Sequence, residues 1–143
     1  MSETARIRIF FALPAPGAAA PLRQVRDRLA AHGRLLKEVA PGHYHITLKF
    51  LGETDQDTCR RIREDFSSFE PGIGEQPYAL RGLGAFPGIR RPRVLWCGLD
   101  MGRDPLIRVQ QSIEELSSRY GFERESRPFA PHLTLARIRG EGT

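Results

Sequence analysis

A four-residue pattern that occurs twice is the feature that most restricts how this chain can fold. Residues His45–Leu48 and His132–Leu135 both read His-x-Thr-Leu, and together they use two of the four histidines. Successive side chains of a β-strand face opposite sides, so residues two apart share a face. Each copy therefore predicts a strand that shows a histidine and a threonine on one face and packs aliphatic side chains from the other.

The segments around these two strands predict short helices and further strands. Strands are expected where apolar, β-branched residues run between glycines and prolines. Helices are expected where a proline or a capping residue precedes an apolar stripe. Strand pairs without a helix between them favour an α+β fold with mostly antiparallel sheet. The expected strands are 7–13, 43–51, 78–83, 93–99 and 132–138, and the expected helices run from Pro21 to Gly33, from Thr54–Asp57 to beyond Phe66, and from Asp104–Pro105 to Gly121.

The composition predicts a single domain with an anionic partner. A length of 143 residues falls within the usual range of one domain, about 100–200 residues. The net charge of +5 comes almost entirely from arginine, because Lys37 and Lys49 are the only lysines. Guanidinium groups match the geometry of phosphate, so the surface favours a phosphate-bearing partner, although it lacks the charge of a protein that coats nucleic acid.

The cysteines and the apolar segments indicate a cytoplasmic protein. Cys59 and Cys97 lack CxxC spacing, which argues against structural zinc, thiol redox chemistry and a disulfide framework. No segment reaches the roughly 18 apolar residues of a membrane span, so no membrane partner is expected. Residues 9–20 imitate a secretory signal, but Pro14 and Pro16 interrupt them, which favours the cytoplasm and reduced thiols.

Two histidines and two threonines that converge would suit a phosphate. A threonine hydroxyl donates to a phosphate oxygen, and its β-branching limits its rotamers. Imidazole has an unperturbed pKa of about 6.5, so one copy can act as a general base while the other acts as a general acid. No metal or other cofactor is expected, because only Glu53 and Asp55 lie near these strands, and a zinc pair of His43 and His45 lacks a third ligand nearby.

The resemblance to a known family rests on both motifs and on their surroundings. Residues 8–13, 45–53, 86–87, 93–99 and 127–137 are similar to the two-histidine (2H) phosphoesterases, and specifically to the LigT-like RNA 2′,3′-cyclic phosphodiesterases, also called 2′-5′ RNA ligases. The resemblance implies a bilobal α+β fold. Two mostly antiparallel sheets would form a V-shaped cleft with helices outside, and each lobe would carry one motif.

The same resemblance implies a role for each site residue. His45 would be the proton donor to the leaving 3′ oxygen, and His132 the proton acceptor that activates water. Thr47 and Thr134 would hold the phosphate oxygens, and Arg137 would neutralise charge in the transition state. The expected substrates are RNA 3′ ends or nucleotides that carry a cyclic phosphate.

Strand alternation does not decide the roles of three residues near the motifs. Parity alone points Arg137 away from His132, so only a bulge or the strand end could redirect it. Phe50 has core parity with Ile46, although a contact with a substrate base is a second interpretation. Lys49 shares the parity of His45, so it could contact phosphate or could be a solvated lysine at the strand end.

The length of the chain and its chemistry leave further alternatives. Relatives continue past the second motif, so a single two-lobed domain over residues 1–143 would lack the family's C-terminal strands after about residue 138. An unpaired sheet edge beside the second motif could recruit another copy, although a monomer is expected. Two rivals to hydrolysis remain, namely reversible 2′-5′ RNA ligation and a non-catalytic module that binds RNA ends through a rim of Arg90, Arg91, Arg93, Arg124 and Arg127.

Overall fold

The computed structural model describes residues 5–72, 74–75 and 77–140. Each expected strand and helix is present within this part of the chain, and the α+β fold class is confirmed. The elements are β1 (Arg6–Pro14), the 3-10 turn η1 (Pro16–Ala18), α1 (Arg23–Ala30), β2 (Leu36–Glu38), the 3-10 turn η2 (Pro41–His43), β3 (His45–Asp55), α2 (Gln56–Phe66), β4 (Ala79–Phe86), β5 (Val94–Met101), α3 (Arg103–Ser118) and β6 (His132–Ile138).

The starts of the helices differ from the predicted ones by one or two residues. The N-cap of α2 is Asp55 rather than Thr54, and its carboxylate accepts hydrogen bonds from the Thr58 amide at 3.0 Å and from the Thr58 hydroxyl at 2.7 Å. These bonds hold the pKa of the Asp55 carboxyl below its usual value. The cap of α3 is Gly102, whose φ of 90° favours glycine, rather than Asp104. Helix α1 begins after Pro21, at Arg23.

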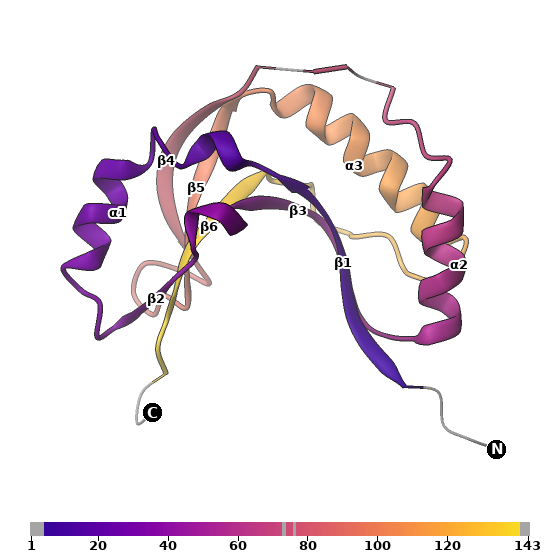
Figure 1. Ribbon diagram of the computed structural model, residues 1–143, viewed down its shortest axis with the longest axis horizontal. Helices are drawn as coiled ribbons and strands as arrows, with labels where there is room; N and C mark the ends of the chain where they lie inside the picture. Colours follow the sequence, from indigo (N-terminus) through magenta and orange to yellow (C-terminus); the bar gives the residue numbers. More distant parts are fainter. Residues whose placement is uncertain (1–4, 73, 76, 141–143) are drawn as a thin grey trace.

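One antiparallel sheet, bent between its two halves, organises the molecule. The strand order is β1-β3-β6-β5-β4, and β2 pairs with β6 off this path. Strands β3 and β6 meet at a single registered pair, Ile46 and Leu133, so the two expected sheets are joined at one point. Figure 1 shows the result as an arch, with β1 and β3 in the right-hand arm and β2 and β6 in the left-hand arm.

In the described part of the chain, the edges of this sheet are β1, β4 and the short strand β2, not β6. Strand β6 pairs with β5 on one side and with β3 and β2 on the other. The predicted unpaired edge beside the second motif is therefore wrong. The strand that closes it, β2, escaped prediction because three residues are too few to show strand periodicity.

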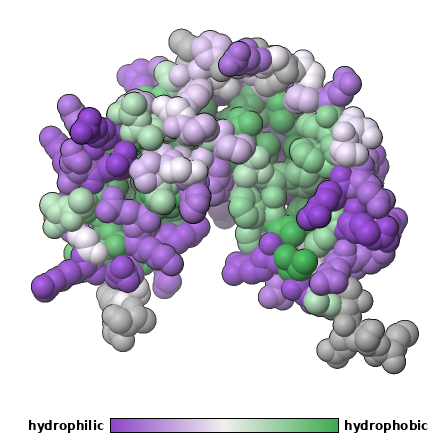
Figure 2. Space-filling model, viewed as in Figure 1, coloured by the Kyte–Doolittle hydropathy of each residue, from purple (hydrophilic) through white to green (hydrophobic). Residues whose placement is uncertain are grey.

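Each arm of the arch has its own apolar core on the outer side of the sheet. The helices cover these cores, α2 and α3 on one arm and α1 on the other, so the inner face of the arch stays open (Figure 1). Figure 2 shows the hollow between the two lobes. The first core is formed by Phe11, Ile46, Leu48, Ile62, Leu99, Leu106, Val109, Ile113 and Leu116, and the second by Ala15, Ala18, Leu22, Tyr44, Cys97, Leu133 and Leu135.

Candidate active site

The two motifs meet where the two halves of the sheet join. Ile46 and Leu133 are both buried in the cores and are directly paired in antiparallel register. Their neighbours along each strand face the opposite way, into the hollow of the arch. Antiparallel pairing about this point sets each histidine across from the threonine of the other motif, and diagonal neighbours in such a ladder lie about 7–8 Å apart. The predicted convergence of two imidazoles and two hydroxyls on one face follows from this single pair.

Both imidazoles are held by the same backbone hydrogen bond. The Nδ1 atom of His45 donates to the carbonyl oxygen of His43 at 2.8 Å, and Nδ1 of His132 donates to that of Ala130 at 2.9 Å. A carbonyl oxygen can only accept, so each Nδ1 carries the hydrogen. The neutral rings therefore leave Nε2 as the basic nitrogen, and a second proton can only bind there. His43, whose spacing from His45 suggested a zinc pair, contributes its carbonyl instead.

Aromatic side chains support both histidines. The ring of Phe10 lies 5.5 Å from that of His45. His132 has two aromatic neighbours, Phe86 at 5.0 Å in an edge-on arrangement and Trp96 at 6.0 Å. These three aromatic residues were not identified as site residues from the sequence. Phe10 could have been identified, because alternation in β1 places it on the inner face with Arg6 and Arg8.

Two glycines beside Trp96 allow its ring to lie on the sheet. Gly84 is paired with Trp96 across β4 and β5, and a Cβ at Gly84 would lie 2.2 Å from the ring atom Cζ2. A Cβ at Gly98 would lie 3.6 Å from Cζ3 of the same ring and 2.9 Å from a backbone oxygen. Trp96 Nε1 is buried and has no hydrogen-bond partner in the described part of the chain. The ring is therefore positioned by packing, and it closes one side of His132.

A bulge follows each motif and redirects the next side chains. The register between β1 and β3 shifts at Leu48, and the register between β5 and β6 shifts at Leu135, the same position of the two motifs. After the shift, Arg137 is paired with Val94 and has the inner-face parity of Thr134. The bulge that Arg137 required is thus present, and this exposed side chain lies on the face of His132.

The equivalent bulge makes the core prediction for Phe50 wrong. Phe50 is 52% exposed and lies on the inner face, where its ring stacks 6.4 Å from that of Phe10. Alternation fails here because the extra residue at Leu48 shifts the phase of β3 as far as a second register shift at Leu51. The parity that placed Phe50 with Ile46 holds only as far as the bulge.

Lys49 fits neither of its two predicted roles. The residue is only 5% exposed, and its Nζ lies 2.9 Å from the Glu114 carboxylate on α3. Nζ also donates to the carbonyl oxygen of Glu123 at 2.7 Å, while Glu114 accepts from the amide of Glu125 at 3.0 Å. The pair ties the strand of the first motif to the segment that leads into the second. Pairing a buried cation with a distant carboxylate is a tertiary event, so strand parity could not show it.

Other parts of the described chain do not compete with this site. A cavity of about 520 Å³ lies on the outer side of β1, between α2 and α3, and its lining is almost entirely apolar. Among the residues described, no three histidine, cysteine, aspartate or glutamate side chains are arranged to hold a metal ion. In the same residues, no helix is long and apolar enough to span a bilayer.

The fold and the duplicated histidine and threonine pairs define a two-lobed protein with a site at the junction of its lobes. Residues 13–96 and 99–141 match the family described as LigT like Phosphoesterase, and this chain belongs to that family. The chain is 40% identical over 119 residues to an "RNA 2′,3′-cyclic phosphodiesterase" of Aeropyrum pernix, a match that covers 83% of this chain and 66% of that protein. The chain spans about two thirds or less of the length of the curated relatives it matches.

Solved structures support the same fold. TT0787 of Thermus thermophilus matches 96% of this chain and 77% of its own with a TM-score of 0.70 and 23% identity, which supports the fold alone. E. coli LigT complexed with 3′-AMP matches 96% of this chain and 76% of its own, with a TM-score of 0.66 and 29% identity.

Proposed function

We propose that this chain hydrolyses 2′,3′-cyclic phosphates at RNA ends or on nucleotides and leaves a 2′-phosphate and a free 3′-hydroxyl. The observation that carries the proposal is the shared hydrogen bond from each histidine Nδ1 to a backbone carbonyl. It leaves two Nε2 atoms free on one face, one from each half of the sheet. Family membership supports the choice of a phosphodiester as the substrate. The names of the relatives support RNA cyclic phosphates in particular.

In the proposed mechanism the two imidazoles move protons in opposite directions. His132 Nε2 takes a proton from water while the water oxygen attacks phosphorus. The bond between phosphorus and the 3′ oxygen breaks, and protonated His45 donates its Nε2 hydrogen to that oxygen. Thr47 and Thr134 donate to the non-bridging oxygens, and Arg137 neutralises the charge that develops on them. Phe50, exposed beside Phe10, stacks on the terminal base.

The first experiment measures hydrolysis of a nucleoside 2′,3′-cyclic phosphate against pH in the presence of a metal chelator. We expect chelator-insensitive turnover with a bell-shaped pH dependence, because one histidine must be neutral and the other protonated. A His32→Ala variant is the control, because that histidine lies outside both motifs. Turnover that disappears with chelator, or that survives loss of His45 or His132, would refute the mechanism.

Two further assays distinguish hydrolysis from ligation and from binding without catalysis. Cleaved RNA halves incubated with the protein would be joined if ligation were the activity, since the same two proton transfers serve the reverse reaction. Tight binding of an RNA end without turnover would instead favour the binding module. The matched pair of tautomer-fixed imidazoles favours catalysis, because phosphate binding alone does not require two proton-transfer groups.

The surroundings proposed for this activity follow from the cysteines and the fold. Cys59 and Cys97 are both free thiols, which suits a reducing compartment such as the cytoplasm. We propose a monomer and a single two-lobed domain, because both motifs come from one chain and share one sheet. Size measurement in solution tests the monomer.

A further inference from the structure

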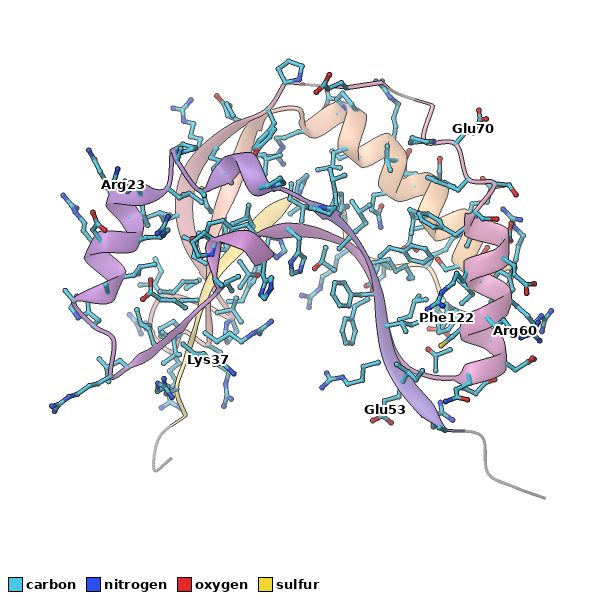
Figure 3. All side chains as sticks on the ribbon, in the orientation of Figure 1. Arg23, Lys37, Glu53, Arg60, Glu70 and Phe122 are labelled. Atoms are coloured by element: carbon cyan, nitrogen blue, oxygen red, sulfur yellow. The ribbon has the colours of Figure 1, made fainter. Side chains whose placement is uncertain are left out.

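The inner face of the left-hand arm carries two cations directly opposite one another. Lys37 of β2 and Arg137 of β6 are paired in antiparallel register. Their strand neighbours Leu36 and Ala136 are buried in the outer core, so alternation turns Lys37 and Arg137 toward the hollow. Both side chains are exposed, and neither has an ion-pair partner within the described residues. Figure 3 labels Lys37 on this arm.

A like-charge pair of this kind destabilises a sheet unless something compensates it. Cross-strand neighbours lie about 4.5–5.5 Å apart, and like charges at that distance repel. The right-hand arm treats its cations differently, because Arg8 lies opposite Glu53 in register and its guanidinium lies 5.6 Å from the centre of the Phe50 ring. Glu53 lies at the lower end of that arm (Figure 3). Both inner walls carry aromatic rings beside their histidine, but only the wall formed by β2 and β6 carries a cation pair without a counter-charge among the described residues.

Its place on β2 separates Lys37 from the proton-transfer groups. Lys37 lies level with Arg137, three residues beyond Thr134, and is one strand, about 4.8 Å, further across the sheet from β5 than Arg137 is. At about 3.3 Å per residue, it sits roughly one nucleotide step beyond a phosphate held at Thr134. An anion beyond the scissile phosphate could reach Lys37, whereas a base stacked on Phe50, on the opposite arm, could not.

We infer that Lys37 binds the phosphodiester on the 5′ side of the terminal nucleotide, so that an RNA strand end is a better substrate than a free cyclic nucleotide. This inference rests on the proposed function. A single-stranded RNA end presents a base on one side of its terminal phosphate and an upstream phosphate on the other, and proteins that bind such strands combine aromatic platforms with cationic grooves. The exposed Phe50 ring on one arm and the unpaired Lys37 ammonium on the other match these two parts.

The test compares two substrates that differ only in the upstream phosphate. One is a nucleoside 2′,3′-cyclic phosphate, and the other is a short oligoribonucleotide that ends in the same cyclic nucleotide. We expect the ratio of kcat/KM for the oligonucleotide to that for the mononucleotide to fall about tenfold in Lys37→Gln, the size of one lost charge-assisted contact, and to recover in Lys37→Arg. The salt dependence of the oligonucleotide reaction should weaken by about 0.7 in log–log slope, the value for one phosphate contact on a single strand.

Arg23→Gln is the matched control, because this substitution removes the same charge from helix α1, on the outer side of the same arm (Figure 3). The inference would be overturned if Lys37→Gln left the kcat/KM ratio unchanged, including by an equal loss on both substrates. It would also be overturned if Arg23→Gln lowered the ratio by the same factor. A wild-type protein that hydrolyses neither substrate would refute the proposed function instead, and a wild type that hydrolyses both with an unaffected Lys37→Gln variant would refute only the upstream subsite.

Discussion

The two halves of the sheet repeat one local design and then diverge at the same position. In both, a histidine Nδ1 donates to the carbonyl two residues before it, aromatic rings pack on the imidazole, and a bulge follows the motif. Beyond the bulge, the first half presents Phe50 and buries Lys49, while the second presents Arg137 and buries Ala136.

This comparison separates what the two halves must share from what they can vary. Two proton transfers of one kind need two imidazoles in equivalent settings, so the motif and its backbone hydrogen bond are kept. In the proposed mechanism the positions after the bulge would meet different parts of the ligand, which accounts for one being aromatic and the other cationic. The buried position after the bulge is Ala136 in the second half and Lys49 in the first, where the lysine connects β3 to α3.

The comparison is tested most severely by removing each histidine in turn. We expect His45→Ala and His132→Ala each to lower kcat by about 10²–10⁴, the usual size of a general acid or base contribution. When the 3′ bridging oxygen of the substrate is replaced by sulfur, the thiolate leaving group does not need a proton. Such a substrate should restore turnover to His45→Ala and not to His132→Ala. Rescue of both variants, or of His132→Ala alone, would contradict the assigned roles.

The buried ion pair provides the largest expected stability difference between the halves. Lys49→Met leaves the Glu114 carboxylate buried without its cation, which should cost about 3–5 kcal/mol in the free energy of unfolding. The double variant with Glu114→Gln should recover part of that loss, because no charge stays buried. Denaturant unfolding measures both, with the exposed Lys37→Met as the control. Equal stability of Lys49→Met and Lys37→Met would mean that the pair does not stabilise the packing of α3 on β3.

The support behind His132 is tested by adding one methyl group. Gly84→Ala places a Cβ inside the space of the Trp96 ring, so the ring must move and stability should fall by about 1–3 kcal/mol. Trp96 is the single tryptophan, so its fluorescence reports the displacement directly. The pH profile should change with it, because the ring packs against His132. Gly88→Ala is the matched control, since a Cβ there meets nothing within 4 Å.

The divergent aromatic position should affect binding more than chemistry. Phe50→Leu removes a stacking surface worth about 1–3 kcal/mol per base, so we expect KM to rise with little change in kcat. Steady-state kinetics on a purine cyclic phosphate measure this. A fall in kcat with an unchanged KM would show that Phe50 acts on the imidazole through Phe10 and does not contact the base.

The smallest expected effect concerns the two cysteines, one in each half. Burial raises the pKa of the Cys97 thiol, so little thiolate forms at mildly alkaline pH, and Cys97 should resist alkylation until the protein unfolds. Cys59, which is partly exposed on α2, should react first. Mass spectrometry of the partially alkylated protein distinguishes them. Simultaneous labelling would show that the second half opens more readily than its packing implies.

Local patterns predicted the elements well and the positions after each motif poorly. The prediction that each histidine and threonine share one face of a strand was correct because a strand period of two holds over four residues without interruption. Phe50 was wrong because a bulge at Leu48 changes the phase, and no residue in the motif indicates that bulge. Strand β2 was missed because three residues show no periodicity, and the partner of Lys49 was missed because it lies far away in the chain.

The sequence by itself determined which residues can exchange protons and that two strands must carry them, because side-chain chemistry and strand alternation are local properties. Only the tertiary structure decided that Ile46 meets Leu133, and that single contact makes one site from two motifs. It also decided that Lys37 lies beside Arg137 and that Trp96 lies against His132. Pairing between strands distant in the chain is selected by the burial of both cores together, which no short stretch of residues encodes.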